Sequence, residues 1–257
     1  LSNTIGDAGV VFGLPVEENG NLYNAAIYLV DGNITQTYFK QSLPNYSVFD
    51  ELRYFTAGKE SAVIKVKGHL IGLLICEDVW QQDCVDQAKQ DGAQALIVLN
   101  ASPFHIGKHI ERVEILQNNA KTFSLPLMYL NMVGGQDELV FDGEAFVMDK
   151  DGNIIVRQPS FVEEVSRTEW HEADGKWICA PQELPPKNVR MMDIYQALMI
   201  GVRDYVNKNR FPGVIIGMSG GIDSALSAIV AIDALGADRV HLVMMPSKYT
   251  SQESLID

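Results

Sequence analysis

Residues 214–227 read VIIGMSGGIDSALS, a short apolar run that leads through a glycine-rich turn into a helical sequence. We expect a buried strand over 214–216 and a helix over 224–235. A strand, a turn and a helix in this order aim the free backbone N–H groups of the first helical turn at one point, where the helix dipole adds positive charge. The stretch therefore predicts a phosphate-binding turn in an open α/β sheet.

Established glycine-loop patterns fit this turn poorly. A Walker A loop requires Lys where Asp223 stands, and the G-x-G-x-x-G dinucleotide pattern is absent. Residues 217–221 match G-x-S-x-G, the nucleophile elbow of α/β-hydrolases, but that fold needs an acid and then a His downstream. Asp233, Asp238 and His241 lie too close to the turn for that role. A glycine-rich helix start, with Asp223 placed for the helix dipole, is the purely structural alternative.

Strands and helices alternate through the preceding sequence, which favours a layered α/β sandwich. The first expected strand covers 8–15, and its apolar sequence predicts that it is buried. The further expected strands cover 23–30 and 34–39 about a turn at 31–33, 62–67, 70–76, 95–99, 127–133, 144–148 and 154–156. The expected helices cover 85–90 and 106–123, and the second of these has an apolar face of Ile110, Val113, Leu116, Ala120 and Phe123. The long segment 40–59 is irregular, and loops of that length are usually functional or mobile.

Periodicity disappears over 170–190, where prolines accumulate, so we expect a linker or an arm there. A helix follows over 191–208, with Ile194, Leu198 and Val202 on one face, and a strand over 240–245 completes a βαβ unit with the glycine turn. The expected division is a first domain over 1–169, a linker over 170–190, and a second domain that begins at 191 and runs to 257.

Composition limits the possible partners. The chain has 257 residues and a formal net charge of -13, which disfavours bulk binding to nucleic acid or to anionic membranes. Its three cysteines, Cys76, Cys84 and Cys179, form no disulfide framework, so a reducing, cytoplasmic setting is expected. No apolar run approaches the roughly 20 residues of a spanning helix. Because the sequence begins at Leu1 and stops within an open sheet, we expect further residues on both sides.

A second group of reactive residues surrounds Cys76. A cysteine at the end of an apolar strand is most often a small buried hydrophobic residue. Here the sequence is LLICEDVW over 73–80, and YFK over 38–40 followed by LPNYSVFDE over 43–51 lies upstream. These stretches resemble the nucleophile and lysine segments of the nitrilase superfamily, which implies an α-β-β-α sandwich that hydrolyses carbon–nitrogen bonds.

The resemblance implies roles for individual residues. Cys76 would attack the amide carbon of L-glutamine, while Lys40 and the backbone N–H of Glu77 would stabilise the oxyanion. Glu51 would support Lys40. The general-base glutamate of the superfamily precedes the lysine segment, and we expect it, like the first strands of the fold, to lie outside this chain; Glu17 and Glu18 are poor substitutes.

The same resemblance assigns glutamine contacts to Tyr46, Ser102 and Lys108, the last two within NASPFHIGKHIER over 100–112. His105 and His109 in this stretch stand at i, i+4, a spacing that suits zinc with Glu111 or Glu114 as a further ligand. No Glu falls between the two histidines, as it does in H-E-x-x-H, so a plain helix start is the favoured interpretation.

The loop SGGIDS over 219–224 resembles the S-G-G-x-D-S loop of the ATP pyrophosphatase superfamily. That resemblance implies ATP as substrate, bound by the residues Gly217, Met218, Ser219, Gly220, Gly221, Ile222, Asp223 and Ser224. Glycines admit the phosphates close to the backbone, serines donate hydrogen bonds, and Asp223 would hold Mg²⁺.

A nitrilase-type unit followed by an ATP pyrophosphatase loop is similar to the family of glutamine-dependent NAD⁺ synthetases, and MPSKYTS over 245–251 also resembles that family. The resemblance implies a cytoplasmic homo-oligomer that takes ammonia from glutamine, amidates deamido-NAD⁺, and converts ATP to AMP and pyrophosphate. Contacts to deamido-NAD⁺ are expected outside this chain. Two alternatives stay open, namely a ligase of the same build with another acceptor, and a non-catalytic fragment.

Overall fold

The computed structural model describes residues 8–173 and 175–246. Its strands are β1 (Val10–Glu18), β2 (Asn21–Val30), β3 (Asn33–Phe39), β4 (Ala62–Val66), β5 (His69–Ile75), β6 (Ala95–Asn100), β7 (Leu127–Asn131), β8 (Val133–Gln136), β9 (Leu139–Asp142), β10 (Phe146–Met148), β11 (Ile154–Arg157), β12 (Trp170–Ala173), β13 (Lys176–Cys179), β14 (Val214–Met218) and β15 (Val240–Met244). Its helices are α1 (Gln82–Gln90), α2 (Lys108–Phe123), α3 (Arg190–Lys208) and α4 (Ile222–Leu235), with 3₁₀ turns η1 (Glu51–Arg53), η2 (Cys76–Trp80) and η3 (Ala237–Arg239).

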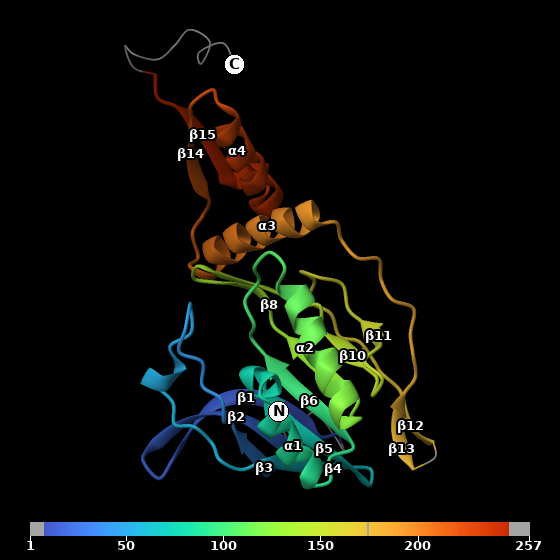
Figure 1. Cartoon of the computed structure of the whole chain (residues 1–257). Coiled ribbons are helices and arrows are strands. Elements are labelled where there is room, and N and C mark those ends of the chain that lie inside the picture. The colour runs from blue at the N-terminus through green and yellow to red at the C-terminus, as the bar shows by residue number, and fades with distance from the viewer. Residues whose placement is uncertain (1–7, 174, 247–257) are drawn as a thin grey trace.

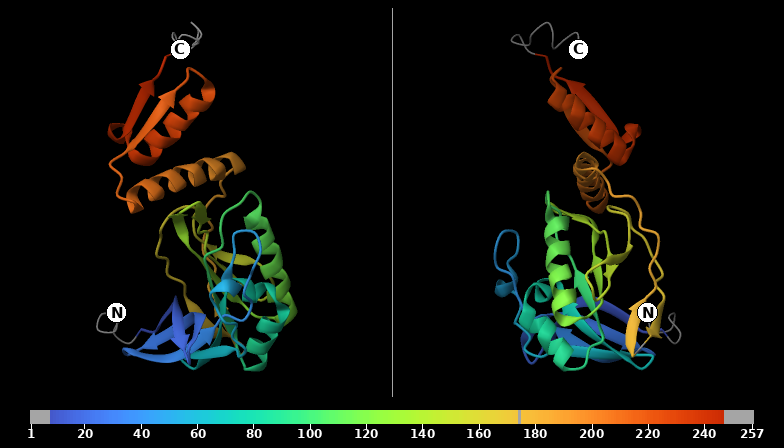
Figure 2. Two further views of the ribbon diagram at one scale, coloured as in Figure 1. Left: turned by 90° about the vertical axis from the view of Figure 1, so that its left-hand side faces the viewer. Right: turned by 45° about the vertical axis from the view of Figure 1, so that its right-hand side comes forward.

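A layered sandwich forms the first part of the chain, as the alternation of strands and helices predicts (Figures 1 and 2). Its main sheet has the order β11-β10-β7-β6-β5-β4, in which the central strands β5, β6 and β7 are parallel and their neighbours antiparallel. Helices α1 and α2 cover one face of this sheet, and the antiparallel sheet β1-β2-β3 packs on the other. Among the described residues, the sandwich thus has one helical layer and two main sheets, which confirms the α/β fold class.

The hairpin of β2 and β3 is confirmed, with its turn at Asp31 and Gly32, both at positive φ. The prediction of a buried first strand is wrong in one respect. Strand β1 exists, but none of its residues is buried, because it lies at the edge of its sheet and pairs only with β2.

Helix α2 is amphipathic as predicted, except at its first turn. Leu116, Ala120 and Phe123 are buried in the main core, whereas Ile110 is 61% exposed. The side chain of Ile110 lines a surface pocket together with Ile194 of α3, so it lies beyond the part of the helix that the sheet covers.

The hairpin of β8 and β9 was not expected from the sequence. Strand β8 contains two glycines, and glycine has a low preference for strands. Because glycine has no side chain, a helix can approach the backbone of this strand closely. The N–H of Gly135 donates to the Asp204 carboxylate of α3 at 2.7 Å, and a Cβ at Gly135 would lie 3.2 Å from the Ile200 carbonyl oxygen. This contact joins α3 to the sandwich.

The face of α3 that packs most deeply differs from the predicted one. Ala197 and Ile200 are buried against Phe161, while Leu198 is 50% exposed. The helix has two partners, since β8 and β9 contact one side and α4 another, so its buried residues do not fall on a single stripe.

The segment 170–190 begins with the hairpin of β12 and β13, and residues 180–189 have no regular structure. Trp177 of β13 stacks on His69 with ring centroids 5.0 Å apart and packs against Trp170. These aromatic contacts fix the start of the segment on the sandwich.

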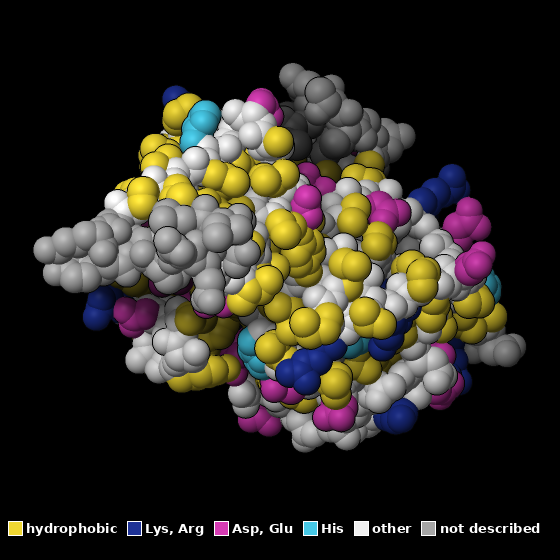
Figure 3. All heavy atoms as spheres, turned by 90° about the horizontal axis from the view of Figure 1, so that it is seen from above, with side chains coloured by type: hydrophobic (Ala, Val, Ile, Leu, Met, Phe, Trp, Pro, Cys, Tyr) yellow, Lys and Arg dark blue, Asp and Glu magenta, His cyan; other side chains and the backbone are white. Residues whose placement is uncertain are grey.

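The predicted βαβ unit is confirmed, because β14 and β15 pair in parallel with α4 between them in the chain. The prediction that β14 is buried is wrong. Ile215 is 75% exposed, since the two-stranded sheet has no second covering layer among the described residues. Figure 3 shows the molecule from above, with many apolar side chains at this surface. Ile222 and Leu226 of α4 are both exposed. Within residues 8–173 and 175–246, no helix is both long and apolar enough to cross a membrane.

Candidate active site

The carboxyl ends of the three parallel strands β5, β6 and β7 meet at one pocket. Such ends are where open α/β sheets bind their ligands. The pocket has a volume of about 390 Å³. Its lining includes Cys76 after β5, Asn100 at the end of β6 and Asn131 at the end of β7, together with Lys40 and Glu51 from the long loop. The structure therefore brings together the cysteine, lysine and glutamate that the sequence singles out.

Cys76 occupies a tight turn between β5 and η2. Its φ of 46° is in the left-handed region, which costs a residue other than glycine about 1–3 kcal/mol and is typical of functional turns. Cys76 as a whole residue is 9% exposed. Burial raises the pKa of Cys76 to about 11, although the ammonium of Lys40 acts to lower it. The resting thiol therefore keeps its proton at neutral pH and needs a base before it can attack.

Lys40 is a buried ammonium with a carboxylate partner. Its Nζ lies 2.6 Å from Glu51 Oε1, and only 1% of the lysine side chain is exposed. Glu51 also accepts a hydrogen bond from Asn24 Nδ2 at 3.3 Å. A buried charge without such partners would be strongly unfavourable, so Glu51 holds Lys40 charged at the wall of the pocket.

The three predicted glutamine-contact residues do not line this pocket. Tyr46 donates to the Glu77 carboxylate at 3.0 Å and packs edge-on against Phe49, which does line it. The ammonium of Lys108 lies 4.3 Å from the Trp80 ring centroid. These two side chains surround the turn of Cys76 rather than its cavity.

Ser102 has buried partners of its own. Its Oγ accepts from Arg112 Nε at 3.3 Å, and its backbone N–H donates to Asn131 Oδ1 at 2.9 Å. Arg112 is 2% exposed and forms two 2.8 Å bonds to the Asp142 carboxylate, which in turn accepts from Asn131 Nδ2. This network, which the sequence did not reveal, fixes Asn131 in the pocket wall.

The two histidines considered as zinc ligands point to different partners. His109 Nδ1 lies 2.8 Å from Glu144, while His105 Nε2 lies 3.9 Å from Glu111. No group of three potential ligands that could hold a metal occurs among residues 8–173 and 175–246.

The SGGIDS loop has the predicted strand–turn–helix geometry. Gly220 has a φ of 77°, which a side chain would disfavour, and α4 begins at Ile222. The hydroxyl of Ser224 donates to the Gly221 carbonyl at 2.9 Å and lies 3.1 Å from that of Ser219. These bonds shape an exposed loop at the positive end of the helix. Residues 247–251 of the MPSKYTS segment lie outside the described residues.

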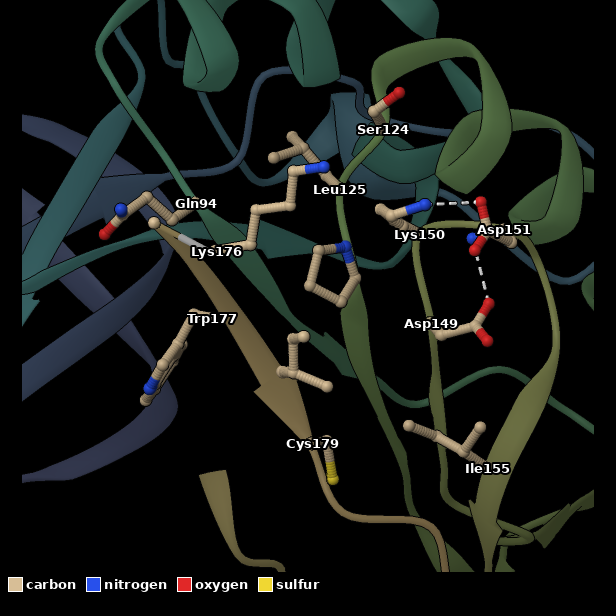
Figure 4. Close-up of a pocket in the computed structure, with 13 residues that line it drawn as sticks. Gln94, Ser124, Leu125, Asp149, Lys150, Asp151, Ile155, Lys176, Trp177 and Cys179 are labelled. Atoms are coloured by element: carbon tan, nitrogen blue, oxygen red, sulfur yellow. Dashed lines mark hydrogen bonds and ion pairs between the residues drawn. The ribbon is translucent and has the colours of Figure 1, made fainter. Parts of the chain in front are cut away.

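Another cavity, of about 360 Å³, lies where β13 meets the turn before β11 (Figure 4). Its walls carry Lys150, paired with Asp151 at 2.6 Å, and Cys179, whose thiol donates to the Ala180 carbonyl oxygen at 3.5 Å. Lys150 and Cys179 thus each have a partner in this region, and Lys176 is a second lysine of the cavity wall.

We expect the rate of Cys76 alkylation by iodoacetamide to rise about tenfold per pH unit between pH 7 and pH 10 without a plateau. With a pKa near 11, the thiolate fraction still increases across this whole range, whereas an ordinary cysteine levels off near pH 9. Peptide-resolved mass spectrometry measures the rate at Cys76 separately from Cys84 and Cys179. A plateau below pH 9 would contradict the assignment of a protonated resting thiol.

Comparison with known proteins supports both halves of the chain. The family model "Carbon-nitrogen hydrolase" matches residues 6–173, and the model "NAD synthase" matches residues 194–257. The glutamine-dependent NAD(+) synthetase of Acinetobacter baylyi is 44% identical over 252 residues, covering 98% of this chain and 46% of that protein. That of Rhodobacter capsulatus is 41% identical, covering 94% and 44%. The chain thus spans about half the length of the curated relatives it matches.

Solved structures give the same picture. A glutamine-dependent NAD+ synthetase from Acinetobacter baumannii, determined with ADP, superimposes with a TM-score of 0.93 at 43% identity and covers 99% of this chain and 48% of its own. An amidase of the nitrilase superfamily from Nesterenkonia, a C145A mutant, superimposes with a TM-score of 0.54 at 25% identity over 60% of this chain and 58% of its own. The second match extends over about the length of the sandwich alone.

Proposed function

Because the chain belongs to the carbon-nitrogen hydrolase family, we propose that its Cys76 pocket takes ammonia from L-glutamine for ATP-dependent amidation of deamido-NAD⁺ to NAD⁺. One observation carries the proposal. A buried cysteine and a buried lysine share one pocket with a half-buried glutamate, and this pocket precedes an SGGIDS loop in the same chain. We assign residues 1–169 to the glutaminase, 170–190 to a linker and 191–257 to the beginning of the synthetase unit.

The pocket supports nucleophilic catalysis. The Cys76 sulfur attacks the amide carbon of glutamine, and the carbonyl oxygen becomes an oxyanion beside the Lys40 ammonium. The backbone N–H of Glu77 is a second donor, because the first N–H groups of a helical turn have no partner within it. Collapse of the intermediate breaks the carbon–nitrogen bond, ammonia leaves with the proton taken from the thiol, and water then hydrolyses the glutamyl thioester.

The surrounding residues would bind and orient the substrate. We propose that the Tyr46 hydroxyl contacts glutamine at the rim of the pocket, since Tyr46 packs on the lining residue Phe49. Lys108 would offer a positive charge beside Trp80. Ser102 would act through Asn131, to which its backbone N–H is bonded. A glutamine side chain placed this way presents its amide to Cys76.

The residues Gly217, Met218, Ser219, Gly220, Gly221, Ile222, Asp223 and Ser224 would bind ATP. Their backbone N–H groups and hydroxyls meet at the start of α4, where the helix dipole favours phosphate. Mg²⁺ is usually held by one or two carboxylates and the phosphates of the nucleotide. Asp223 stands in the first turn of α4 and would be such a carboxylate ligand. The ion would neutralise phosphate charge. We also propose a reducing, cytoplasmic setting, which the free thiols of Cys76, Cys84 and Cys179 support.

A direct assay tests the function. The natural full-length protein, given glutamine, ATP, Mg²⁺ and deamido-NAD⁺, should form one NAD⁺, one AMP and one pyrophosphate for each amide transferred, as measured by chromatography. Omitting ATP should stop NAD⁺ formation but allow ammonia release. Ammonia release without amidation of deamido-NAD⁺ would point to another acceptor, and absence of ammonia release would contradict the glutaminase assignment.

A further inference from the structure

Asp78, the second residue after Cys76, is fully buried and accepts four hydrogen bonds. Its Oδ1 accepts the backbone N–H groups of Gln41 at 3.1 Å and Ser42 at 2.8 Å. Its Oδ2 accepts the Tyr38 hydroxyl at 2.8 Å and the backbone N–H of Ile75 at 3.1 Å. One carboxylate thus satisfies donors from two segments that lie more than thirty residues apart in sequence.

The two segments carry the two reactive groups of the pocket. Lys40 lies between Tyr38 and Gln41, and Cys76 directly follows Ile75. The lysine segment continues β3 of the three-stranded sheet, whereas the cysteine segment continues β5 of the six-stranded sheet. Backbone pairing within either sheet therefore does not set the separation of the ammonium and the thiol.

We propose that Asp78 is a positioning residue of the amide-hydrolysing site, whose carboxylate holds the Lys40 ammonium against the Cys76 thiol. The inference rests on the proposed glutaminase function of the pocket. Asp78 itself need not contact the substrate, because each of its carboxylate oxygens is already engaged by two protein donors. Its effect on the reaction passes through the placement of Lys40.

Asparagine at this position could not reproduce the arrangement. Both carboxylate oxygens accept backbone N–H groups, so the amide nitrogen of Asn would face at least one N–H donor whichever way it turned. At least one segment would then have to move away. Reacting groups must hold their geometry closely, and a displacement of about 1 Å can cost about 100-fold in rate.

The charge of Asp78 allows two effects on Cys76 to be distinguished, namely the placement of Lys40 and the direct electrostatic effect of the Asp78 carboxylate on the thiol. The negative charge of Asp78 itself raises the pKa of Cys76, while the positive charge of Lys40 lowers it. Removing the charge without movement would lower the thiol pKa and speed its alkylation. Releasing Lys40 from the thiol would raise the pKa and slow alkylation, and positioning predicts this second result.

The test uses Asp78→Asn in the natural full-length protein. We expect kcat for ammonia release from glutamine to fall about 10- to 100-fold with a much smaller change in KM. Alkylation of Cys76 by iodoacetamide, followed between pH 7 and pH 10, should become slower at every pH. Synthesis driven by added ammonia should be unchanged. Asp83→Asn, the same change at an exposed position five residues on, is the control and should match the wild type in all measurements.

Tyr38→Phe keeps the test decisive if Asp78→Asn does not fold, because it removes one of the four bonds and leaves the carboxylate in place. It should lower kcat roughly three- to tenfold and slow alkylation. If Asp78→Asn folds, an unchanged kcat in this variant overturns the proposal. If Asp78→Asn does not fold, an unchanged kcat in Tyr38→Phe overturns it. Faster alkylation in Asp78→Asn does so too. Lack of ammonia release by the wild type would instead overturn the glutaminase function.

Discussion

Cys76→Ala should abolish glutamine-driven NAD⁺ synthesis while synthesis from added ammonia survives. The substitution removes the only atom of the pocket assigned to attack the amide, and removal of a nucleophile typically lowers a rate by several orders of magnitude. The proposed synthetase reaction would not need the thiol, because the SGGIDS loop lies on a separate βαβ unit. Initial rates of NAD⁺ formation with glutamine and with ammonium chloride, measured on the same preparation, give the comparison.

Cys179→Ala provides the matched control for this experiment. Cys179 is also a buried thiol, but it lies in the cavity of Figure 4 and is bonded to the Ala180 carbonyl. Both activities should be retained in that variant. Equal loss of the glutamine and ammonia reactions in Cys76→Ala would contradict the division of labour between the two halves.

The reactive residues of the pocket were accessible from sequence because each lies in a local pattern. Cys76 ends an apolar strand and Lys40 follows another, and the turn chemistry around both is encoded within about ten residues. That the two residues meet was expected only from the resemblance to the nitrilase superfamily, because Lys40 follows an antiparallel strand of a different sheet from the strand that Cys76 ends. What local patterns omit is the part of the site that depends on distant contacts.

Asp78 and Arg112 illustrate that omission. Asp78 bonds residues up to 40 positions away, and Arg112 pairs with Asp142 across 30 positions. In sequence, both are ordinary charged residues that belong on a surface. Their burial is decided by partners that no helical or strand period reveals, and the hydrogen bond from Arg112 to Ser102 is hidden from the sequence in the same way.

Burial of whole strands was overestimated for a related reason. Apolar composition led to the prediction that β1 and β14 are buried, but burial depends on the layers that cover a strand. An edge position leaves β1 half-exposed, and the covering of β14 on a single face leaves Ile215 exposed. Hydrophobic composition predicted where the strands lie, but it does not indicate how many neighbouring strands or covering layers each strand has.

Asp223→Ala should have the opposite effect to Cys76→Ala, with ATP-dependent synthesis lost and glutamine hydrolysis retained. The carboxylate stands in the first turn of α4 beside the phosphate loop, and its removal takes away the proposed protein ligand of Mg²⁺. We expect the dissociation constant for Mg·ATP, measured by calorimetry, to rise at least about tenfold, which corresponds to one charge-assisted ligand. Asp238→Ala, an acidic residue in η3 beyond the other end of the helix, is the control. Unchanged ATP affinity in Asp223→Ala would show that the loop binds ATP without this residue.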